Sequence, residues 1–454
     1  MRELSLSVLP SVVGGETRGD FSSDADISSI TTDSRTVTPG CLFAAIPGER
    51  VDGHDFIASA AQKGAACVLC ERFAEADVPQ LRVPDTQAAL RTLAAYYRAR
   101  FDIPVVGVTG SVGKTTAKEM IAAVLSARFS TLKTEKNFNN ELGVPLTLFR
   151  LREEHEAAVV EMGISGFGEM TRLAAMVRPT VAVYTLIGDA HLEFLGDRAG
   201  VLRAKAEMIS GVAEDGVVIA NGDDELLRSH DFGRRTVRFG FGESCDVRAE
   251  SVENDGLSGM SCVIRAGERR IPVRIPSFGR HLVYAALMGA AVGIELGLTD
   301  AEIARGVARF ETVGSRGRVL ECGGMTILDD CYNANPTSTT TSLDSLAMLP
   351  GRHVAILGDM LELGPTSPEL HRSVGEHAAR TGALVIACGP MAEHIAAGAG
   401  EGARWFPDRP ALLAALPELV RPGDAVLVKA SHSMGFEAVV AALTGAGSES
   451  SDHR

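Results

Sequence analysis

The segment that decides the fold runs Gly107-Val-Thr-Gly-Ser-Val-Gly-Lys-Thr-Thr116. It follows the short β-branched run 104–109 (PVVGVT) and opens the helical pattern 117–129 (AKEMIAAVLSARF). A glycine-rich turn between a strand and a helix is the setting of a phosphate-binding loop. Glycines let backbone N–H groups converge on phosphate oxygens, and the helix N-terminus adds the positive end of its dipole. The segment therefore predicts a site for a nucleoside phosphate.

Two side chains of the loop carry chemistry of their own. Lys114 is expected to reach the β- and γ-phosphates, and the Thr115 hydroxyl to bind Mg²⁺. The strict G-x-x-x-x-G-K pattern fails, because Val108 stands where its first glycine belongs. A glycine-rich turn without a ligand is the alternative, but the strand, Lys-Thr-Thr and helix together favour the phosphate loop. The predicted nucleotide contacts are Gly110, Ser111, Val112, Gly113, Lys114, Thr115 and Thr116.

An acidic residue follows the next strand-like run. The run 157–160 (AAVV) ends at Glu161, the place of a metal-binding acid in phosphate-loop proteins, with Glu instead of the usual Asp. A solvated loop carboxylate is the alternative. The N-K-x-D signature of guanine-binding switch proteins is absent. A switch or scaffold protein that binds a nucleotide without catalysing ligation is the alternative from a different functional class. The absence of the guanine signature argues against it.

Outward from the loop, strand-like and helix-like segments alternate. Buried strands are predicted at 157–163, 180–187 and 216–221, with helices between them, and the alternation is expected to continue for about two hundred residues. Such alternation implies a mainly parallel sheet covered by helices.

Both flanks of this region form their own α/β patterns. On the N-terminal side, strands are predicted at 41–47 and 67–70, and helices at 55–64 and 86–100, the second capped by Asp85. From Gly314 onward, a smaller α/β unit is predicted, with a helix at 367–381, and the polar tail 444–454 is expected to be disordered. Its predicted strands are 325–330, 353–359, 383–389 and 424–431.

Length and composition agree with a multidomain globular protein. At about 150 residues per domain, 454 residues suggest three domains, which we place at 1–83, 84–313 and 314–454. The formal net charge of −14 argues against nucleic acid or an anionic membrane as a main partner. Neither a signal peptide nor a membrane-spanning run is evident, and eight cysteines are too few for a disulfide scaffold, so we expect a soluble cytoplasmic protein. Cys67 and Cys70 form a C-x-x-C inside an apolar run, which indicates a buried strand more than a metal or redox site.

Beyond the loop, a set of longer segments gives the chain a family resemblance. From about Thr31 to Glu437, the sequence resembles the Mur ligase superfamily. The two most specific segments, DDCYNANPTS (329–338) and LGDMLELG (357–364), are similar to the branch that adds a dipeptide. The D-N-P-R of the sister ligase is absent, and folylpolyglutamate synthase lacks YNANP. The other matching segments are TTDSRTVTPGCLFAAIPGERVDGHDF (31–56), TGSVGKTTAKEM (109–120), KNFNNELGVPLTL (136–148), EMGISGFGEM (161–170), IGDAHLEFLG (187–196), RAKAEM (203–208) and GR (317–318).

The resemblance implies both a fold and a reaction. The implied fold is α/β in three domains: a small N-terminal domain for a UDP-sugar, a central phosphate-loop ATPase domain with a mostly parallel sheet, and a C-terminal Rossmann-like domain. The implied reaction uses ATP to join D-alanyl-D-alanine to UDP-N-acetylmuramoyl-tripeptide through an acyl phosphate, as a step of cytoplasmic peptidoglycan precursor synthesis. A related ligase with a different acceptor, for muramoyl-peptide recycling or a folate, is the alternative. The family also suggests a monomer.

The resemblance further implies two Mg²⁺ ions. One would be held by Thr115 and Glu161, and the other by His191 and a carbamylated Lys205; Lys114, His191 and Lys205 would be catalytic. Without the resemblance, the sequence favours the interpretation of His191 as a structural histidine at the end of a strand. It favours the interpretation of Lys205 as a solvated helix residue.

The remaining implied contacts involve the nucleotide and the substrates. Arg318 and Asp330 match positions that contact ATP phosphate and ribose, with a surface charge and a turn carboxylate as the alternatives. Some of the substrate positions have a structural alternative, because Asp-Ser-Arg and Asn-Pro segments also form turns. The implied substrate contacts are Ser34 and Arg35 for the UDP group, Asn139 and Asn140 for the muramoyl peptide, and Tyr332, Asn333 and Asn335.

Three departures from the family pattern leave questions open. Leu282 and Ala285 replace two asparagines, so the adenine contacts are undetermined. His432 stands in place of an arginine near the C-terminus, and Ser165 in place of an asparagine. The sequence determines neither the third residue of the peptide (lysine or diaminopimelate) nor whether the domains are open or closed.

Overall fold

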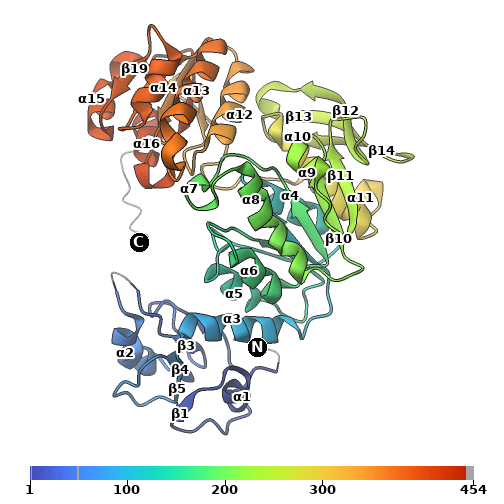
Figure 1. Cartoon of the computed structure of the whole chain (residues 1–454), viewed down its shortest axis with the longest axis vertical. Coiled ribbons are helices and arrows are strands. Elements are labelled where there is room, and N and C mark those ends of the chain that lie inside the picture. Colours follow the sequence, from blue (N-terminus) through green and yellow to red (C-terminus); the bar gives the residue numbers. More distant parts are fainter. Residues whose placement is uncertain (2, 49–50, 446–454) are drawn as a thin grey trace.

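The computed structural model describes residues 1, 3–48 and 51–445. Three α/β parts follow one another along the long axis of the molecule, in chain order from bottom to top in Figure 1. This agrees with the predicted fold class. Residues 446–454, most of the tail for which disorder was predicted, lie outside the described residues.

The N-terminal part is built on a mixed sheet. β1 pairs antiparallel with β5, and the other neighbours are parallel. Cys67 and Cys70 are free, buried thiols at the two ends of β4, as the apolar run predicted. The sheet order is β1 (Glu16–Arg18), β5 (Gln80–Arg82), β4 (Cys67–Cys70), β3 (Leu42–Ala44) and β2 (Ile30–Thr31), and the short helices are α1 (Leu9–Val13) and α2 (Ile57–Gln62).

Helix α3 (Thr86–Arg98) connects this sheet to the central part. The Asp85 side chain accepts a hydrogen bond from Ala88 N at 2.9 Å, which confirms the predicted cap. The Tyr97 hydroxyl donates to Leu151 O at 2.8 Å, and Arg98 Nε to Val177 O at 3.1 Å. Residues of α3, the N-terminal sheet and the central part share one hydrophobic core, so α3 packs against both neighbours (Figure 1).

The central sheet places the predicted strands side by side. The strands from β7 to β12 are parallel, and in the four central strands β6, β8, β9 and β10 alternate side chains enter the cores on the two faces. The sheet order is β14 (Arg269–Ile275), β13 (Met260–Ala266), β12 (Val247–Asn254), β11 (Arg235–Gly240), β10 (Val217–Asn221), β9 (Val181–Tyr184), β6 (Val105–Thr109), β8 (Ala157–Glu161) and β7 (Thr131–Lys133).

Helices cover both faces of this sheet. One face is covered by α4 (Lys114–Leu125), α10 (His281–Glu295) and α11 (Asp300–Ala308). The other is covered by α5 (Gly143–Leu148), α6 (Glu169–Val177) and α8 (Arg198–Ala206). The short helices α7 (Leu192–Leu195) and α9 (Glu225–Ser229) lie in loops that follow β9 and β10.

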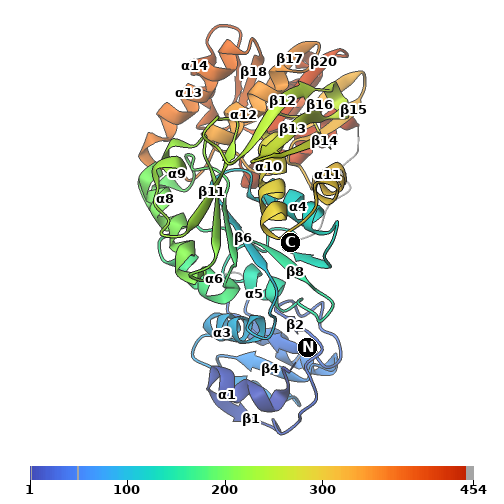
Figure 2. The ribbon, with the colours of Figure 1, turned by 90° about the vertical axis from the view of Figure 1, so that its right-hand side faces the viewer.

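The predicted alternation of strand and helix is wrong beyond β11. There the chain forms an antiparallel extension of β12, β13 and β14, which Figure 2 shows beside α10. In β14, Ile271, Val273 and Ile275 are buried while the residues between them are exposed. Such two-residue alternation is typical of an antiparallel sheet with one solvated face, and so distinguishes this segment from the parallel core.

The C-terminal sheet contains the four predicted strands as neighbours. The edge strands β15 and β19 were not predicted; β15 runs antiparallel to β16, and the other pairs are parallel. The order is β15 (Arg318–Cys322), β16 (Met325–Asp329), β20 (Asp424–Lys429), β17 (Arg352–Gly358), β18 (Leu384–Cys388) and β19 (Arg404–Phe406). The accompanying helices are α12 (Pro336–Ala347), α13 (Ser367–Arg380), α14 (Ala392–Ala399), α15 (Arg409–Leu419) and α16 (Glu437–Thr444). In the part of the chain that the structure describes, no helix is long and apolar enough to cross a membrane.

Gly306 limits how closely α11 can approach α4, the helix that follows the phosphate loop. A Cβ at this position would lie 2.4 Å from Val124 Cα, so Gly306→Ala must push the two helices apart. Overpacking costs about 1–3 kcal/mol, whereas alanine gains about 1 kcal/mol of helix propensity over glycine. We expect denaturant unfolding to show a net loss, because the clash is with backbone. Ala308→Ser, an exposed change on the same helix, is the control, and a gain of stability in Gly306→Ala would contradict the packing argument.

Candidate active site

The phosphate loop is fastened to the end of β9. Ser111 N donates to Leu186 O at 2.7 Å, and the Thr185 hydroxyl donates to Val112 O at 2.5 Å. Gly110 lies so close to β9 that a Cβ there would be 1.9 Å from Thr185 Oγ1. Gly113, at the N-cap of α4, has φ +81°, a left-handed conformation that glycine adopts without strain. The loop conformation is therefore set by the neighbouring strand as well as by its own glycines.

Lys114 is half-buried at the start of α4. Its Nζ donates to Gly110 O at 2.8 Å, across the loop. Burial lowers the pKa of Lys114, the negative charge of Glu161 opposes that shift, and the positive charge of Arg316 adds to it. Lys114 thus interacts electrostatically with a carboxylate of the central domain and with a guanidinium from the segment before β15, and all three groups line one cavity.

Glu161 ends β8 beneath the loop, almost fully buried. Its Oε1 accepts hydrogen bonds from Thr115 Oγ1 at 3.2 Å and from Asn139 Nδ2 at 2.9 Å. Its Oε2 is buried without a hydrogen-bond partner among the described residues. A buried carboxylate oxygen beside a threonine hydroxyl is a suitable ligand for a hard divalent cation. The alternative of a solvated loop carboxylate is wrong.

Lys205 lies on α8 and is fully buried. Its Nζ has no hydrogen-bond partner within the described residues. Burial lowers the pKa of Lys205 well below its usual value, and the positive charge of Lys114 lowers it further. The interpretation of Lys205 as a solvated helix residue is therefore wrong.

His191 stands at the N-cap of α7 with φ +56°. Its Nδ1 lies 2.6 Å from Oε2 of Glu362, which the C-terminal domain contributes; this is an ion-pair contact whose alignment is not that of a hydrogen bond. This contact lowers the pKa of the Glu362 carboxyl. His191 is therefore placed where the central and C-terminal domains meet.

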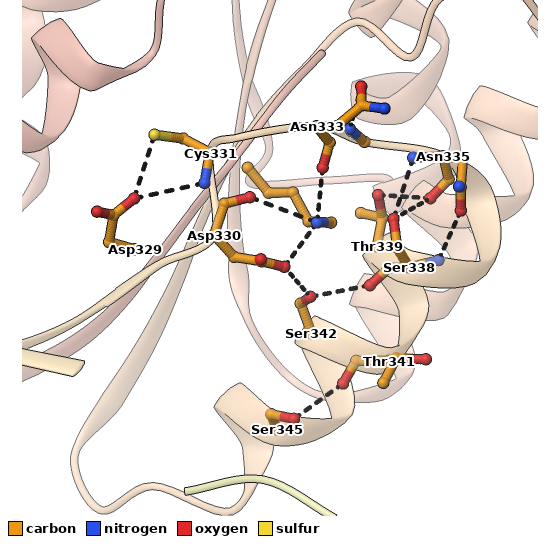
Figure 3. A network of polar contacts seen from close by, with 12 residues as sticks. Asp329, Asp330, Cys331, Asn333, Asn335, Ser338, Thr339, Thr341, Ser342 and Ser345 are labelled. Carbon is orange, nitrogen blue, oxygen red and sulfur yellow. Dashed lines mark hydrogen bonds and ion pairs between the residues drawn. The ribbon is translucent and has the colours of Figure 1, made fainter. Parts of the chain in front are cut away.

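A network around Asp330 forms the C-terminal wall of the site (Figure 3). Asp330 Oδ2 accepts hydrogen bonds from Lys429 Nζ and from the Ser342 hydroxyl, both at 2.6 Å. Lys429 also donates to Asn333 O at 2.9 Å and is nearly fully buried. One lysine of β20 thus fixes the loop that joins β16 to α12.

Several predicted substrate residues have structural partners. Asn335 caps α12 through a reciprocal pair of bonds with Ser338, Asn333 Oδ1 accepts from Ala334 N, and Asn140 Oδ1 accepts from Gly143 N. The Tyr332 ring lies under the Arg316 guanidinium at 3.6 Å and 5.1 Å from the His432 ring. The Asn335 side chain therefore has the structural role that was considered as the alternative to substrate binding for the Asn-Pro turn.

A cavity of about 1010 Å³ brings most of the predicted residues together. The phosphate loop from Ser111 onward, the metal-site residues Thr115, Glu161 and His191, and the loop after β16 line it, whereas Gly110 and Lys205 do not. Two predicted groups lie elsewhere: Ser34 and Arg35 are in the N-terminal domain, where Arg35 pairs with Asp33, and Arg318 is exposed at the start of β15. The predicted residues that line the cavity are Ser111, Val112, Gly113, Lys114, Thr115, Thr116, Asn139, Asn140, Glu161, His191, Asp330, Tyr332, Asn333 and Asn335.

Sequence reasoning missed residues at the far end of the cavity. Tyr284, whose hydroxyl donates to Asp223 Oδ2 at 2.9 Å, lines it, as do Arg280 and Arg316. Leu282 is buried in the core beneath α10, whereas Ala285 lines the cavity. Residues three apart lie on the same side of a helix, so helical spacing alone does not separate these two positions.

The part of the chain that the structure describes contains no cluster of three or more His, Cys, Asp or Glu side chains able to hold a metal. A cation in this cavity would therefore need oxygen atoms of the bound nucleotide or substrate as further ligands. Mg²⁺ commonly binds in this way, through one or two carboxylates and substrate phosphates.

The fold and the cavity define a class of protein. A three-domain α/β chain with a phosphate loop at the domain junction is a nucleotide-dependent enzyme. Family profiles match in chain order: "Mur ligase family, catalytic domain" at 26–98, "Mur ligase middle domain" at 108–293, and "Mur ligase, glutamate ligase domain" at 308–432. The chain belongs to the Mur ligase family, and it is an ATP-dependent ligase.

Relatives match over nearly the whole chain. The UDP-N-acetylmuramoyl-tripeptide–D-alanyl-D-alanine ligase of Escherichia coli is 38% identical over 98% of this chain and 99% of its own. The enzyme of the same name from Bacillus subtilis is 35% identical over 91% of this chain and 92% of its own. Among solved structures, MurF from Acinetobacter baumannii superposes with a TM-score of 0.92 at 32% identity, covering 97% of this chain and 99% of that one. MurF from Thermotoga maritima in complex with ADP superposes with a TM-score of 0.82 at 31% sequence identity, covering 92% of this chain and 97% of that one.

The bond from Thr185 to Val112 provides a test of how β9 holds the loop. Thr185→Val keeps the shape but removes the hydroxyl, and a hydrogen bond of this kind contributes about 0.5–1.5 kcal/mol. Because the loop must be held in its phosphate-binding form, we expect ADP affinity, measured by calorimetry, to fall several-fold. Thr180→Val, just before the start of the same strand, removes the bonds of its hydroxyl with Val105 N and Val105 O and should leave ADP affinity unchanged. Equal ADP affinities in the two variants would show that the loop does not depend on β9.

Proposed function

We propose that this chain uses ATP to join D-alanyl-D-alanine to UDP-N-acetylmuramoyl-tripeptide, in the cytoplasmic assembly of peptidoglycan precursor. The cavity carries the proposal, because it places the phosphate loop, Glu161 and His191 of the central domain opposite the Asp330 loop of the C-terminal domain. The full-length relatives named for this reaction support the choice of substrates.

The reaction brings two anions together. The terminal carboxylate of the tripeptide attacks the γ-phosphate of ATP, and the amine of D-alanyl-D-alanine then displaces phosphate from the acyl phosphate. The peptide bond forms, ADP and phosphate leave, and the amine loses its proton. Positive charge must be concentrated where the anions meet. Lys114 and Arg316 supply it, from the central domain and from the segment before β15.

The residues present fit a Mg²⁺ ion beside the loop. The unpartnered Oε2 of Glu161 and the hydroxyl of Thr115 would hold it, and Asn139 fixes the carboxylate from the other side. When bound, the cation supplies Lewis-acid neutralisation of phosphate charge. The work of the chain is to keep the Glu161 carboxylate charged and oriented.

A second Mg²⁺ would be held by His191 and a modified Lys205. An ammonium at Lys205 would repel a cation, whereas the neutral amine can add CO₂, releasing a proton and becoming an anionic carbamate with oxygen ligands. Burial of Lys205 without a hydrogen-bond partner among the described residues favours the neutral amine that this addition needs.

The substrates divide among three domains, for which we propose the ranges 1–83, 84–313 and 314–454. Ser34 and Arg35 would hold the UDP group, Asn139 and Asn140 the muramoyl peptide, and the C-terminal domain the incoming dipeptide. Arg318 and Asp330 remain our candidates for nucleotide contacts. A monomer suffices for this arrangement, because every one of these residues lies on one chain.

The test is a ligation assay with matched variants. We expect wild-type enzyme, ATP, UDP-N-acetylmuramoyl-tripeptide and D-alanyl-D-alanine to yield ADP, phosphate and a product whose mass equals the joined substrates. Lys114→Ala should lower turnover by at least about 100-fold, since it removes a charge aimed at the transferring phosphate. Arg309→Ala, which removes an exposed charge of the same domain, is the control.

Two outcomes of this assay would overturn the proposal. No product with D-alanyl-D-alanine, together with turnover on glutamate, alanine or a murein peptide, would assign a different acceptor. Near-normal turnover by folded Lys114→Ala would exclude its role at the γ-phosphate.

Carbamylation of Lys205 is testable without turnover. Enzyme equilibrated with ¹³C-bicarbonate should show a carbamate carbon resonance that is missing in Lys205→Met. The signal should be lost as the pH falls through the lowered pKa of Lys205, because only the neutral amine reacts. Lys133→Met removes an exposed lysine of the central domain and should keep the signal. A wild-type spectrum without the resonance would contradict the modification.

A further inference from the structure

The contact between His191 and Glu362 joins two domains. His191 begins α7 in the central domain, and Glu362 lies in the loop after β17 in the C-terminal domain. Besides the 2.6 Å approach of Nδ1 to Oε2, Glu193 N donates to Glu362 O at 3.3 Å. Side chain and backbone of Glu362 therefore both contact the start of α7.

Both partners have unusual backbone conformations. His191 has φ +56° and Glu362 φ +62°, in the left-handed region that non-glycine residues seldom adopt. Residues held in such conformations cluster at functional sites, where the surrounding structure imposes them. Here two of them meet at a single contact, next to the cavity that His191 lines.

Glu362 is fixed to the body of its own domain. Leu361 N donates to Ser431 Oγ at 2.9 Å, Ser431 N donates to Asp359 O at 3.0 Å, and Met360 N donates to His371 Nε2 at 2.9 Å. The loop therefore cannot follow α7 independently, and the Glu362 carboxylate reaches His191 only when the two domains are in this arrangement.

We propose that Glu362 is a positioning residue, which accepts the Nδ1 proton of His191 and so leaves Nε2 as the nitrogen free to hold a divalent cation. Metal-binding histidines commonly have a carboxylate on the other ring nitrogen, which fixes tautomer and orientation. This inference rests on the proposed function for the second cation. It adds that the C-terminal domain completes a cation site of the central domain when the domains close.

The competing interpretation is an ordinary ion pair. The Glu362 side chain is 48% exposed and that of His191 24% exposed, and exposed pairs contribute little to stability. An ordinary pair predicts that loss of Glu362 leaves cation binding unchanged, whereas a positioning role predicts weaker cation binding.

The experiment compares Glu362→Ala and Glu362→Gln with a control, Glu193→Gln, which changes an exposed carboxylate of the same contact region. Binding of Mn²⁺ to each full-length enzyme with a non-hydrolysable ATP analogue is followed by electron paramagnetic resonance, and the Mg²⁺ requirement of ligation by activity. Circular dichroism verifies folding. We expect Glu362→Ala to weaken Mn²⁺ binding at one site by about 10–100-fold and to raise the Mg²⁺ requirement in parallel. Glu362→Gln should retain most binding, because its amide oxygen still accepts the Nδ1 proton, and Glu193→Gln should match wild type.

Two results would overturn the inference: Mn²⁺ affinity in Glu362→Ala equal to that of wild type, or equal losses in Glu362→Ala and Glu362→Gln. The Mn²⁺ measurement needs no acceptor substrate. If wild type fails to ligate D-alanyl-D-alanine while Glu362→Ala still binds Mn²⁺ more weakly, the proposed acceptor is wrong and the positioning role stands.

Discussion

The arrangement of the active site depends on the half-buried Lys114 ammonium and the buried carboxylate of Glu161, which attract each other across the end of the sheet. Burial penalises each charge separately, and the pair offsets part of that cost. The parallel sheet makes this possible, because β6 and β8 are neighbours whose carboxyl ends deliver the loop and the acid to one edge. β9 is the other neighbour of β6 and fastens the loop from its far side.

Local charge has to overcome the global charge. At a formal −14, the chain repels polyanionic substrates, so the attraction must come from the cavity. Lys429 does not provide it: its ammonium is already bonded to Asp330 and to the Asn333 carbonyl, so it orders the loop after β16. Two positive groups of the cavity can provide it: Lys114, whose hydrogen bond is to a loop carbonyl, and Arg316, whose guanidinium lies over the Tyr332 ring.

The sequence predicted those parts of the molecule whose cause is local. The strand–glycine–helix order around Gly110, the cap at Asp85 and the parallel strands follow from short-range patterns, and the structure confirms them. The meander β12–β14 was missed because its two-residue alternation lies inside a region of otherwise buried strands. Tertiary contacts were inaccessible for a different reason: nothing near Arg316 or Glu362 in sequence indicates that each faces the central domain.

The departures from the family pattern have unequal consequences. Leu282 is part of the core under α10. Leucine in place of the family's asparagine therefore affects core packing and does not change the wall of the cavity. Ala285 does line the cavity, and a small side chain leaves room beside Tyr284, whose hydroxyl is bonded to Asp223. This end of the cavity is therefore formed in part by the Tyr284–Asp223 pair, which is held by α10 and the turn after β10. The phosphate end is held by β6, β8 and β9, so one continuous sheet fixes both ends of the nucleotide cavity. The C-terminal domain contributes Arg316 and the Asp330 loop to the same cavity, and Glu362 to the contact with His191.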